Sequence, residues 1–253
     1  MKKKQKLLSI ITVVKNDVFN IEKTIKSIIS QKAKKVEFVV IDGKSNDGTI
    51  KIINKYKNKI DKIVIEKDNG IYHAMNKGIK FSSGKYIGFC NSGDLINKGG
   101  IKAIINNLLN NTDVLFATVK RHYLGKTIIK SGFDLKRLNY NFDFATSHST
   151  GFYVKLKFHK TLGLYDTSFK CSSDYDFYYR LLKRRKIKIK STPKNKIIGI
   201  VQEGGFSSTL SPMQHIIEET KIRIKNKQNL IIIFLIFLNA TIKSFFKLLK
   251  KLF

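Results

Sequence analysis

Polar side chains follow three apolar stretches of the sequence, and one of them is an acid in a setting typical of phosphate chemistry. Asp94 ends an apolar run within 85–95 that closes in small and acidic residues, which indicates a buried strand delivering a carboxylate to a cleft. Asn16 and Asp42 follow two other apolar runs in the same way. In an open α/β sheet, ligands bind beyond the carboxyl ends of the strands, and a carboxylate there commonly holds a divalent metal beside phosphate oxygens. The sequence therefore predicts a phosphate-binding cleft at the carboxyl ends of these strands.

Two further acids stand together in front of a helical pattern over 177–185. Asp174 would lie at the helix N-terminus, where free N–H groups favour a carboxylate, so capping is an alternative to a catalytic role. Asp176 is four residues before Arg180, and a surface ion pair is the default interpretation of that spacing. Both acids stay candidates for the cleft.

Glycine-rich signals of nucleotide binding are sparse. Adjacent Gly204 and Gly205 would let backbone N–H groups approach an anion, although an ordinary loop explains them equally well. The first apolar run is followed by no Gly-x-Gly-x-x-Gly, and there is no Gly-Lys-Ser/Thr loop, so the sequence has neither a dinucleotide fingerprint nor a P-loop.

The elements that must position these residues alternate between strands and helices. Near-continuous apolar runs indicate strands buried on both faces, and apolar residues three and four apart indicate helices between them. This alternation predicts right-handed βαβ units and a mixed, mostly parallel sheet flanked by helices. The predicted strands are 7–14, 36–41, 63–65 and part of 85–95, and the predicted helices are 21–29, a helix opening near 49, 70–81 and 101–109.

The pattern changes after this first half. Segments 114–120 and 127–129 are interpreted as two strands turning at Leu124-Gly125, added antiparallel to the parallel sheet. Segment 133–146 is weakly patterned and polar, as in a loop over a cleft. Two short strands are expected on either side of Pro193.

Composition bounds the classes of protein. The 253 residues allow one large α/β domain, and the net charge of +31 suggests an anionic partner or mere compositional bias. The two cysteines offer neither a disulfide framework nor a metal cluster and indicate a reducing compartment. Residues 7–14 are too short and polar for a signal peptide. We expect a cytoplasmic protein.

The C-terminal segment 213–253 forms a separate basic, helical extension to a domain over 1–212. Its nine-residue apolar run, Leu230 to Leu238, is short of the roughly 20 residues that span a bilayer. Phenylalanine and leucine then alternate with lysine, as in a helix lying in an anionic membrane interface. We expect attachment to the inner face of the cell membrane; packing on its own domain or on a second subunit is the alternative.

Three motifs together resemble the family-2 glycosyltransferases of GT-A fold, the bacterial enzymes of polysaccharide and O-antigen biosynthesis. They are Ser9 to Asn16, Val40 to Thr49 and Asp68 to Gly78, in the order that the family shows, and the likeness extends over about 210 residues. The resemblance implies a nucleotide-diphospho-sugar transferase that moves a hexosyl or N-acetylhexosaminyl group to a lipid-linked or growing glycan. We expect the donor to be a UDP-sugar. The resemblance also implies inversion at the sugar and a Mg²⁺ or Mn²⁺ cofactor.

The resemblance carries roles onto particular residues. Asp94 would bind the metal, and Asp174 would be the catalytic base that takes the proton of the acceptor hydroxyl. The residues expected to bind the nucleotide sugar are Thr12, Asn16, Asp42, Asn76, Lys77 and Ser92. The candidates on the acceptor side are His148, Asp176, Gly204 and Gly205; for His148 a hydrogen-bonded structural role is equally compatible.

Two departures from the family pattern bear on the mechanism. The metal motif usually carries two adjacent acids, whereas here Gly93 precedes Asp94, and His73 stands where aspartate is frequent. Because Mg²⁺ and Mn²⁺ are bound partly by substrate phosphates and water, one carboxylate is compatible with a weaker site. An inactive relative acting as a membrane-associated scaffold is therefore the second interpretation. The interpretation as a nucleic-acid-binding protein is supported by the net charge alone. The interpretation as a nucleotidyltransferase is disfavoured because the sequence lacks the activating loop of that class.

Overall fold

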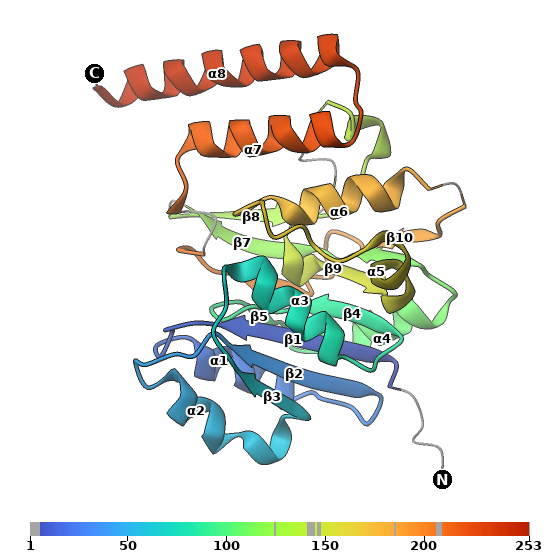
Figure 1. The fold of residues 1–253 in the computed structure, drawn as a ribbon. Helices are drawn as coiled ribbons and strands as arrows, with labels where there is room; N and C mark the ends of the chain where they lie inside the picture. Colours follow the sequence, from blue (N-terminus) through green and yellow to red (C-terminus); the bar gives the residue numbers. More distant parts are fainter. Residues whose placement is uncertain are drawn as a thin grey trace.

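The computed structural model describes residues 6–123, 125–140, 145, 148–184, 186–205 and 209–252, without the side chains of 123 and 247–252. Within these residues the chain forms a central sheet with helices on both faces and a helical hairpin at one end (Figure 1). The sheet is mixed and mostly parallel, which confirms the predicted fold class. The predicted boundary between 212 and 213 stays a prediction.

The central sheet has the strand order β10-β6-β9-β4-β1-β2-β3. Strand β9 is antiparallel to both of its neighbours, and all other pairs are parallel. Strands β1 and β2 are buried along their whole length, as their uninterrupted apolar sequences require. The bounds are β1 Leu8–Val14, β2 Val36–Asp42, β3 Lys62–Ile65, β4 Tyr86–Phe89, β6 Val114–Phe116, β9 Phe152–Lys155 and β10 Ile189–Ser191.

Helices cover the two faces of this sheet in separate apolar layers. Apolar side chains of α1, α2 and α4 pack on one face, and those of α3, α5 and α6 pack on the other. Gly78 lets α3 lie close to β1, because a Cβ at this position would come within 2.4 Å of Ile11 Cγ2. The bounds are α1 Ile21–Ile29, α2 Thr49–Lys55, α3 Ile71–Phe81, α4 Gly100–Leu109, α5 Leu156–Leu162 and α6 Ser173–Leu182, with short 3-10 turns η1 Lys57–Lys59, η2 Leu135–Arg137 and η3 Ser149–Gly151.

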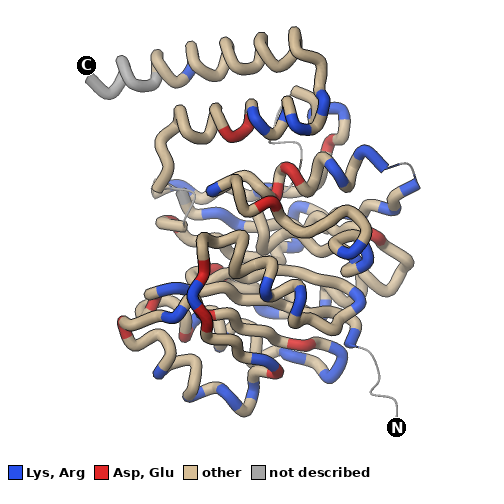
Figure 2. The backbone as a smooth tube through the Cα atoms, viewed as in Figure 1, with Lys and Arg blue, Asp and Glu red and all other residues tan. Residues whose placement is uncertain are grey.

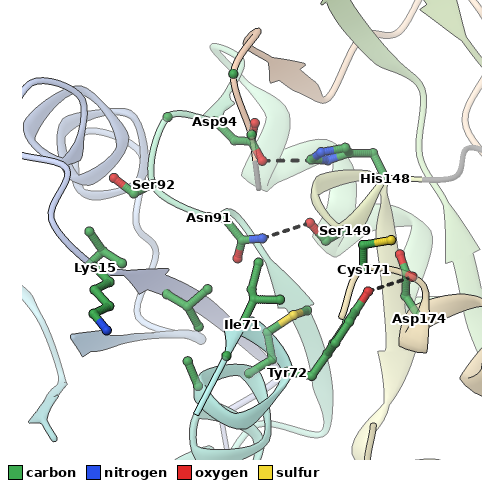
Figure 3. Close-up of a pocket in the computed structure, with 18 of the residues that line it drawn as sticks. Lys15, Ile71, Tyr72, Asn91, Ser92, Asp94, His148, Ser149, Cys171 and Asp174 are labelled. Carbon is green, nitrogen blue, oxygen red and sulfur yellow. Dashed lines mark hydrogen bonds and ion pairs between the residues drawn. The ribbon is translucent and has the colours of Figure 1, made fainter. Parts of the chain in front are cut away.

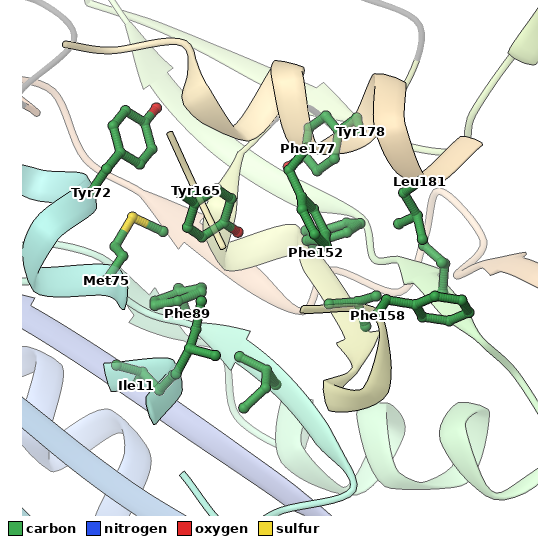
Figure 4. Close-up of a cluster of buried hydrophobic side chains, with 14 of the residues drawn as sticks. Ile11, Tyr72, Met75, Phe89, Phe152, Phe158, Tyr165, Phe177, Tyr178 and Leu181 are labelled. Atoms are coloured by element: carbon green, nitrogen blue, oxygen red, sulfur yellow. The ribbon is translucent and has the colours of Figure 1, made fainter. Parts of the chain in front are cut away.

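Aromatic side chains fill the layer beneath α6 (Figure 4). The ring centroids of Phe152 and Tyr178 are 4.6 Å apart, and His159 stacks on Phe177 at 4.2 Å. Burial holds the pKa of His159 down to about 3, so its ring is neutral and packs as an aromatic residue. This layer fixes the first turn of α6, which carries Asp174, against the sheet.

The structure has a second, four-stranded sheet, so the expectation that 114–120 and 127–129 are two strands added to the parallel sheet is wrong in part. That first segment is two strands: β6 belongs to the central sheet, and β7 (Val119–Tyr123) pairs with β8 (Lys126–Lys130) in a separate sheet of order β5-β11-β7-β8. The chain changes sheet at Thr118, whose N–H donates to Thr192 Oγ1 at 2.7 Å instead of continuing the ladder. Strands β5 (Leu95–Ile96) and β11 (Gly199–Val201) complete it.

Part of the expected loop 133–146 falls at 141–144 and 146, outside the described residues. Its described portion contains η2 and a bridge between Phe133 and Ala145, and it accepts hydrogen bonds from α6 and α7. No described residue of the segment lines the cavity discussed below, so the expectation of a loop over the cleft is not supported there.

The C-terminal hairpin consists of α7 (Pro212–Lys225) and α8 (Leu230–Leu252), stacked over α6 (Figure 1). Helix α7 begins with a capping box in which Ser211 and Gln214 bind each other's backbone N–H groups, and Pro212 occupies the first turn. Lysine and arginine occur along most of the chain, whereas the part of α8 that is coloured in Figure 2 is mostly uncharged. No helix in the described residues has the length and apolar character needed to cross a bilayer.

Candidate functional site

A cavity of about 740 Å³ opens at the carboxyl ends of β1 and β4 (Figure 3). Its wall is built from the loops after these strands, the start of α3, the segment before η3, the first turn of α6, the glycine-containing loop after β11 and the inner side of α7. This is the position that open α/β sheets use for ligands. Both Asp94 and Asp174 line it.

The Asp94 carboxylate is held between η3 and α1. Thr150 Oγ1 donates to Asp94 Oδ2 at 2.7 Å, and His148 Nδ1 lies 3.7 Å from the same oxygen. From the other side, Thr24 donates to the Asp94 carbonyl at 2.8 Å and accepts from the Gly93 N–H at 3.1 Å. Burial raises the pKa of Asp94, although His148 opposes the rise. Burial lowers the pKa of His148, which favours the neutral ring.

Gly93, which stands where the family usually has a second acid, has a backbone conformation that favours glycine. Its φ is +93°, a value that L side chains rarely adopt, and no atom lies within 4 Å of the place that a Cβ would occupy. A side chain at 93 would thus enter open cavity space but strain the loop. Among the described residues, no three His, Cys, Asp or Glu side chains form a group that could hold a metal ion. Asp94 and His148, whose Oδ2 and Nδ1 are 3.7 Å apart, are a pair of donors that a cation could share, with its other ligands coming from a diphosphate and water.

Asp174 lies in the first turn of α6, as the sequence predicted. Its Oδ1 accepts a hydrogen bond from the Tyr72 hydroxyl and another from the Tyr175 N–H, each at 3.1 Å (Figure 3). Burial raises the pKa of Asp174 to about 6, against the lowering effect of these donors. A carboxylate with such a pKa accepts a proton more readily than an exposed aspartate does, which suits a general base at neutral pH.

Asn16 and Ser92 lie in the cavity wall together with Asp94. Asn16 has φ +51°, and its side chain accepts from the Asn46 N–H at 2.9 Å, which ties the loop after β1 to the loop after β2. Ser92 Oγ donates to Asp17 Oδ2 at 2.6 Å. The structure therefore brings these two predicted residues together.

Four other predicted residues lie behind the wall. Thr12 and Asp42 are buried, with Thr12 donating to the Cys90 carbonyl at 2.7 Å and Asp42 accepting from Ser45. Asn76 Nδ2 donates to the Tyr165 carbonyl at 2.8 Å, and Lys77 pairs with Asp68 at 2.9 Å. None of the four side chains lines the cavity. Their nucleotide-binding role stays a prediction.

The acceptor-side candidates divide in the same way. His148, Gly204 and Gly205 line the cavity, although 206–208, which continue the glycine loop, lie outside the described residues. Asp176 does not line it: its side chain is fully buried, 2.9 Å from Arg180 Nε, 3.2 Å from Lys225 Nζ and 3.0 Å from Asn226 Nδ2. The expected surface ion pair is thus a buried one, because α7 covers it.

The cavity also contains residues that sequence reasoning missed. Lys15 and Arg121 supply positive charge, and Asp17 and Asp68 supply negative charge. Two side chains of α7, His215 and Glu219, also line the cavity. Lys15 and Asp17 could have been predicted from the sequence, because they flank Asn16 directly after an apolar run. Arg121 and the α7 residues look like ordinary surface residues in the sequence.

The α/β fold, with two acids in one cavity at the carboxyl ends of its strands, is that of a ligand-binding α/β domain, and comparison with known proteins gives the family. The model of the family described as Glycosyl transferase family 2 matches residues 9–182, which is more than half of the chain. The chain therefore belongs to this family. This confirms the resemblance drawn from the three motifs.

Curated relatives are glycosyltransferases of bacteria. The chain is 29% identical over 188 residues to an uncharacterized glycosyltransferase of Rickettsia typhi, covering 70% of this chain and 59% of that protein. It is 31% identical over 131 residues to the UDP-Glc:alpha-D-GlcNAc-diphosphoundecaprenol beta-1,3-glucosyltransferase WfaP of Escherichia coli, covering 50% of each. Across eight of its curated relatives, the chain spans between 34% and 61% of their length.

Solved structures support the fold. The Staphylococcus aureus TarS 1–349 complex with UDP-GlcNAc superposes with a TM-score of 0.69 at 22% identity, covering 86% of this chain and 66% of that one. The mannosyltransferase PcManGT of Pyrobaculum calidifontis, in complex with GDP-Man and Mn²⁺, gives 0.65 at 16% identity, covering 90% and 68%. At these identities the likeness is one of fold.

Proposed function

We propose that this family-2 glycosyltransferase moves a hexosyl or N-acetylhexosaminyl group from a UDP-sugar to a hydroxyl of a lipid-linked or growing glycan in bacterial surface polysaccharide synthesis. The observation that carries the proposal is one cavity with Asp94 and Asp174 in its wall, on different elements. The WfaP and TarS names support a UDP-linked donor, and the WfaP name supports a lipid-linked acceptor.

The proposed chemistry is a single displacement. The acceptor oxygen forms a bond to the anomeric carbon while the bond from that carbon to the diphosphate breaks, so an α-linked donor gives a β-linked product. Asp174 takes the proton of the attacking hydroxyl, and the nucleotide diphosphate leaves with the bonding electrons. Arg121 and Lys15 lie in the same wall and would stabilise the negative charge of the leaving group.

Asp94 and His148 are the residues that would hold a Mg²⁺ or Mn²⁺ ion. When bound, such an ion supplies charge stabilisation to the departing diphosphate. The surrounding wall holds Asp94 in place, because Thr150 binds its side chain and Thr24 binds its backbone carbonyl. Burial also keeps water from screening the attraction between Asp94 and a cation.

Transfer of radiolabelled sugar to a lipid-linked acceptor tests the proposal, with Asp174→Asn, Asp94→Asn and, as a matched control, the exposed Asp134→Asn. We expect Asp174→Asn to lose roughly 10²–10⁴-fold in kcat. Its thermal stability should not fall at pH 8, because the variant removes a buried charge. Full activity of Asp174→Asn would refute its role as the base. Calorimetry with UDP and Mn²⁺ addresses the scaffold interpretation, which predicts no binding.

We also propose that α8 lies on an anionic membrane surface. Its outward apolar side chains are 44–71% exposed and form one stripe: Leu230, Ile231, Phe234, Leu235, Leu238, Ile242, Phe245 and Phe246. Residues 230–252 contain four lysines and no acid, so a second copy of the helix would repel, whereas anionic headgroups would attract.

Co-sedimentation of the full chain with vesicles tests the membrane contact. Vesicles containing phosphatidylglycerol should bind the chain, pure phosphatidylcholine should bind it less, and Phe234→Asp with Phe245→Asp should abolish binding. Leu109→Asp, which changes an equally exposed apolar residue on α4, is the control. Absence of vesicle binding, or a dimer in sedimentation that the two phenylalanine variants disrupt, would overturn the proposal in favour of protein contact.

A further inference from the structure

Helix α7 lies beyond the residues that match the family, yet it forms part of the cavity wall. The match ends at 182, and α7 begins at Pro212. Two of its side chains, His215 and Glu219, line the same cavity as Asp94 and Asp174. The site therefore contains a wall that the shared family domain does not provide.

The inner side of α7 is fixed to the domain on both sides of Glu219. Glu218 accepts hydrogen bonds from the backbone N–H groups of Lys170 and Cys171 at 2.5 and 3.0 Å. One turn later, Arg223 is 1% exposed and donates to the Tyr179 hydroxyl at 2.9 Å. Because His215 and Glu219 are four residues apart, they share the face of the helix that these contacts turn toward the cavity.

This wall stands next to the catalytic base. His215 Nδ1 lies 3.3 Å from Cys171 Sγ, and Cys171 is three residues before Asp174 and close enough for the Asp174 charge to raise the pKa of its thiol (Figure 3). A group bound against α7 thus lies at the end of the cavity where a proton is accepted.

Glu219 has acceptor capacity that the protein does not use. Its carboxylate accepts no hydrogen bond from any described residue; burial raises its pKa to about 7, although the charge of Arg223, one turn along α7, opposes the rise. A partly buried carboxyl group without donors is stabilised by any ligand that brings hydroxyl groups to it.

The basic residues of the cavity wall lie at the Asp94 end, beside acids that include Asp17 and Asp68. Arg121 acts on Asp94 and His148, lowering the pKa of both, and Lys15 follows β1. By contrast, the described lining residues from 171–175 and 215–219 include two acids and no lysine or arginine. The second end would repel a phosphate or carboxylate.

We propose that His215 and Glu219 form an acceptor subsite that selects a neutral, hydroxyl-rich sugar next to Asp174 and rejects an anionic one. The inference rests on the proposed glycosyl transfer and adds the class of acceptor to it. The neutral sugar's hydroxyl groups donate to Glu219, while its reacting hydroxyl faces the base.

The test separates acceptor recognition from donor chemistry. Purified full-length chain is given the UDP-sugar that it hydrolyses fastest, with octyl β-glucoside or octyl N-acetyl-β-glucosaminide as neutral acceptors and octyl glucuronide as the anionic counterpart. Transfer and donor hydrolysis are measured at pH 8.5, above the pKa of Glu219, for wild type, Glu219→Gln, His215→Gln and the control Glu22→Gln, which changes a half-buried glutamate on α1 outside the cavity.

We expect wild type to use the neutral acceptors at least tenfold better in kcat/KM than the glucuronide. Glu219→Gln should lower transfer to the neutral acceptors about tenfold, since one hydrogen bond to a charged group contributes about 1.5–3 kcal/mol. It should bring the glucuronide within about threefold of them, because the repulsive charge is removed. His215→Gln should reduce transfer to the neutral acceptors as well. Donor hydrolysis and Glu22→Gln should stay within twofold of wild type.

Three results would overturn the inference: equal use of neutral and anionic acceptors, unchanged selectivity in Glu219→Gln, or a parallel loss of donor hydrolysis, which would mean a structural role. If no UDP-sugar is hydrolysed or transferred, the proposed function fails, and binding then decides the subsite by itself. Saturation-transfer NMR with methyl β-glucoside and methyl glucuronide in the presence of UDP should show the neutral glycoside only, with its signal lost in Glu219→Gln. No signal from either glycoside would overturn the subsite.

Discussion

The pH dependence of transfer should report the Asp174 carboxyl group and respond to a single hydroxyl next to it. Only the ionised form accepts a proton, so activity should fall as the pH drops through the pKa of Asp174. Because burial raises this pKa to about 6, the acid limb should lie near pH 6 and not near pH 4.

Tyr72→Phe tests this assignment. The Tyr72 hydroxyl donates to Asp174 Oδ1 at 3.1 Å and lowers the pKa of Asp174, while the Tyr72 ring packs 5.5 Å from the Tyr165 ring and would remain. Hydrogen bonds to charged groups contribute about 1.5–3 kcal/mol, and this one is long, so the low end applies. About 1.4 kcal/mol corresponds to one pH unit. The limb should therefore rise by roughly one unit in the variant.

The assay is kcat/KM for the acceptor at saturating donor from pH 5 to 9. With a limb one unit higher, activity of Tyr72→Phe should be about fivefold below wild type at pH 6 and nearly equal to it at pH 8.5. Tyr86→Phe removes another buried hydroxyl, which donates to the Thr112 carbonyl at 2.6 Å far from the cavity, and should leave the limb in place.

His148 and Glu219 also line the cavity, where burial lowers the pKa of His148 and raises the pKa of Glu219 to about 7. Neither accepts a hydrogen bond from Tyr72, so a limb that belongs to them would not move in Tyr72→Phe. A wild-type limb near pH 4, or an unmoved or lower limb in Tyr72→Phe, would refute the assignment of Asp174 as the base.

The remaining predictions concern stability and are measured by denaturant unfolding. Asp176→Asn should cost about 2–4 kcal/mol, because it leaves the mostly buried Arg180 without its charge partner, whereas Lys225 keeps Asp166; a loss below 1 kcal/mol would show that the pair is solvated. Gly78→Ala should cost about 1–3 kcal/mol, since the added methyl meets Ile11 at 2.4 Å, and a neutral effect would mean that α3 shifts freely. Gly93→Ala and Gly93→Asp should each cost about 1–2 kcal/mol through φ alone; a cost confined to the aspartate would point to charge repulsion.

Sequence patterns predicted the elements whose environment is uniform along their length. Strands β1 and β2 are buried on both faces, and α3 has one apolar side, so periodicity alone identifies them. The exchange of sheets at Thr118 depends on Thr192, 74 residues away, and no local pattern in 114–120 contains that contact.

The same distinction holds for the site. Asp94 and Asp174 stand in local motifs, and the structure brings both to the cavity. Asp176 has a local partner in Arg180 but is buried by Lys225 and Asn226 of the hairpin, which spacing cannot reveal. Glu219 belongs to a helix with ordinary surface composition, and the long-range contacts of Glu218 with Lys170 and Cys171 and of Arg223 with Tyr179 turn it inward.

The backbone at Gly93 makes evolutionary change at this position asymmetric. A chain with an acid at 93 needs a single substitution to arrive at glycine, after which the loop is free to adopt φ +93°. The reverse substitution places a side chain at a φ that costs about 1–2 kcal/mol, in a loop where the Gly93 N–H donates to Thr24 Oγ1. Recovery of the second carboxylate therefore costs stability through the backbone, whatever it adds to metal affinity.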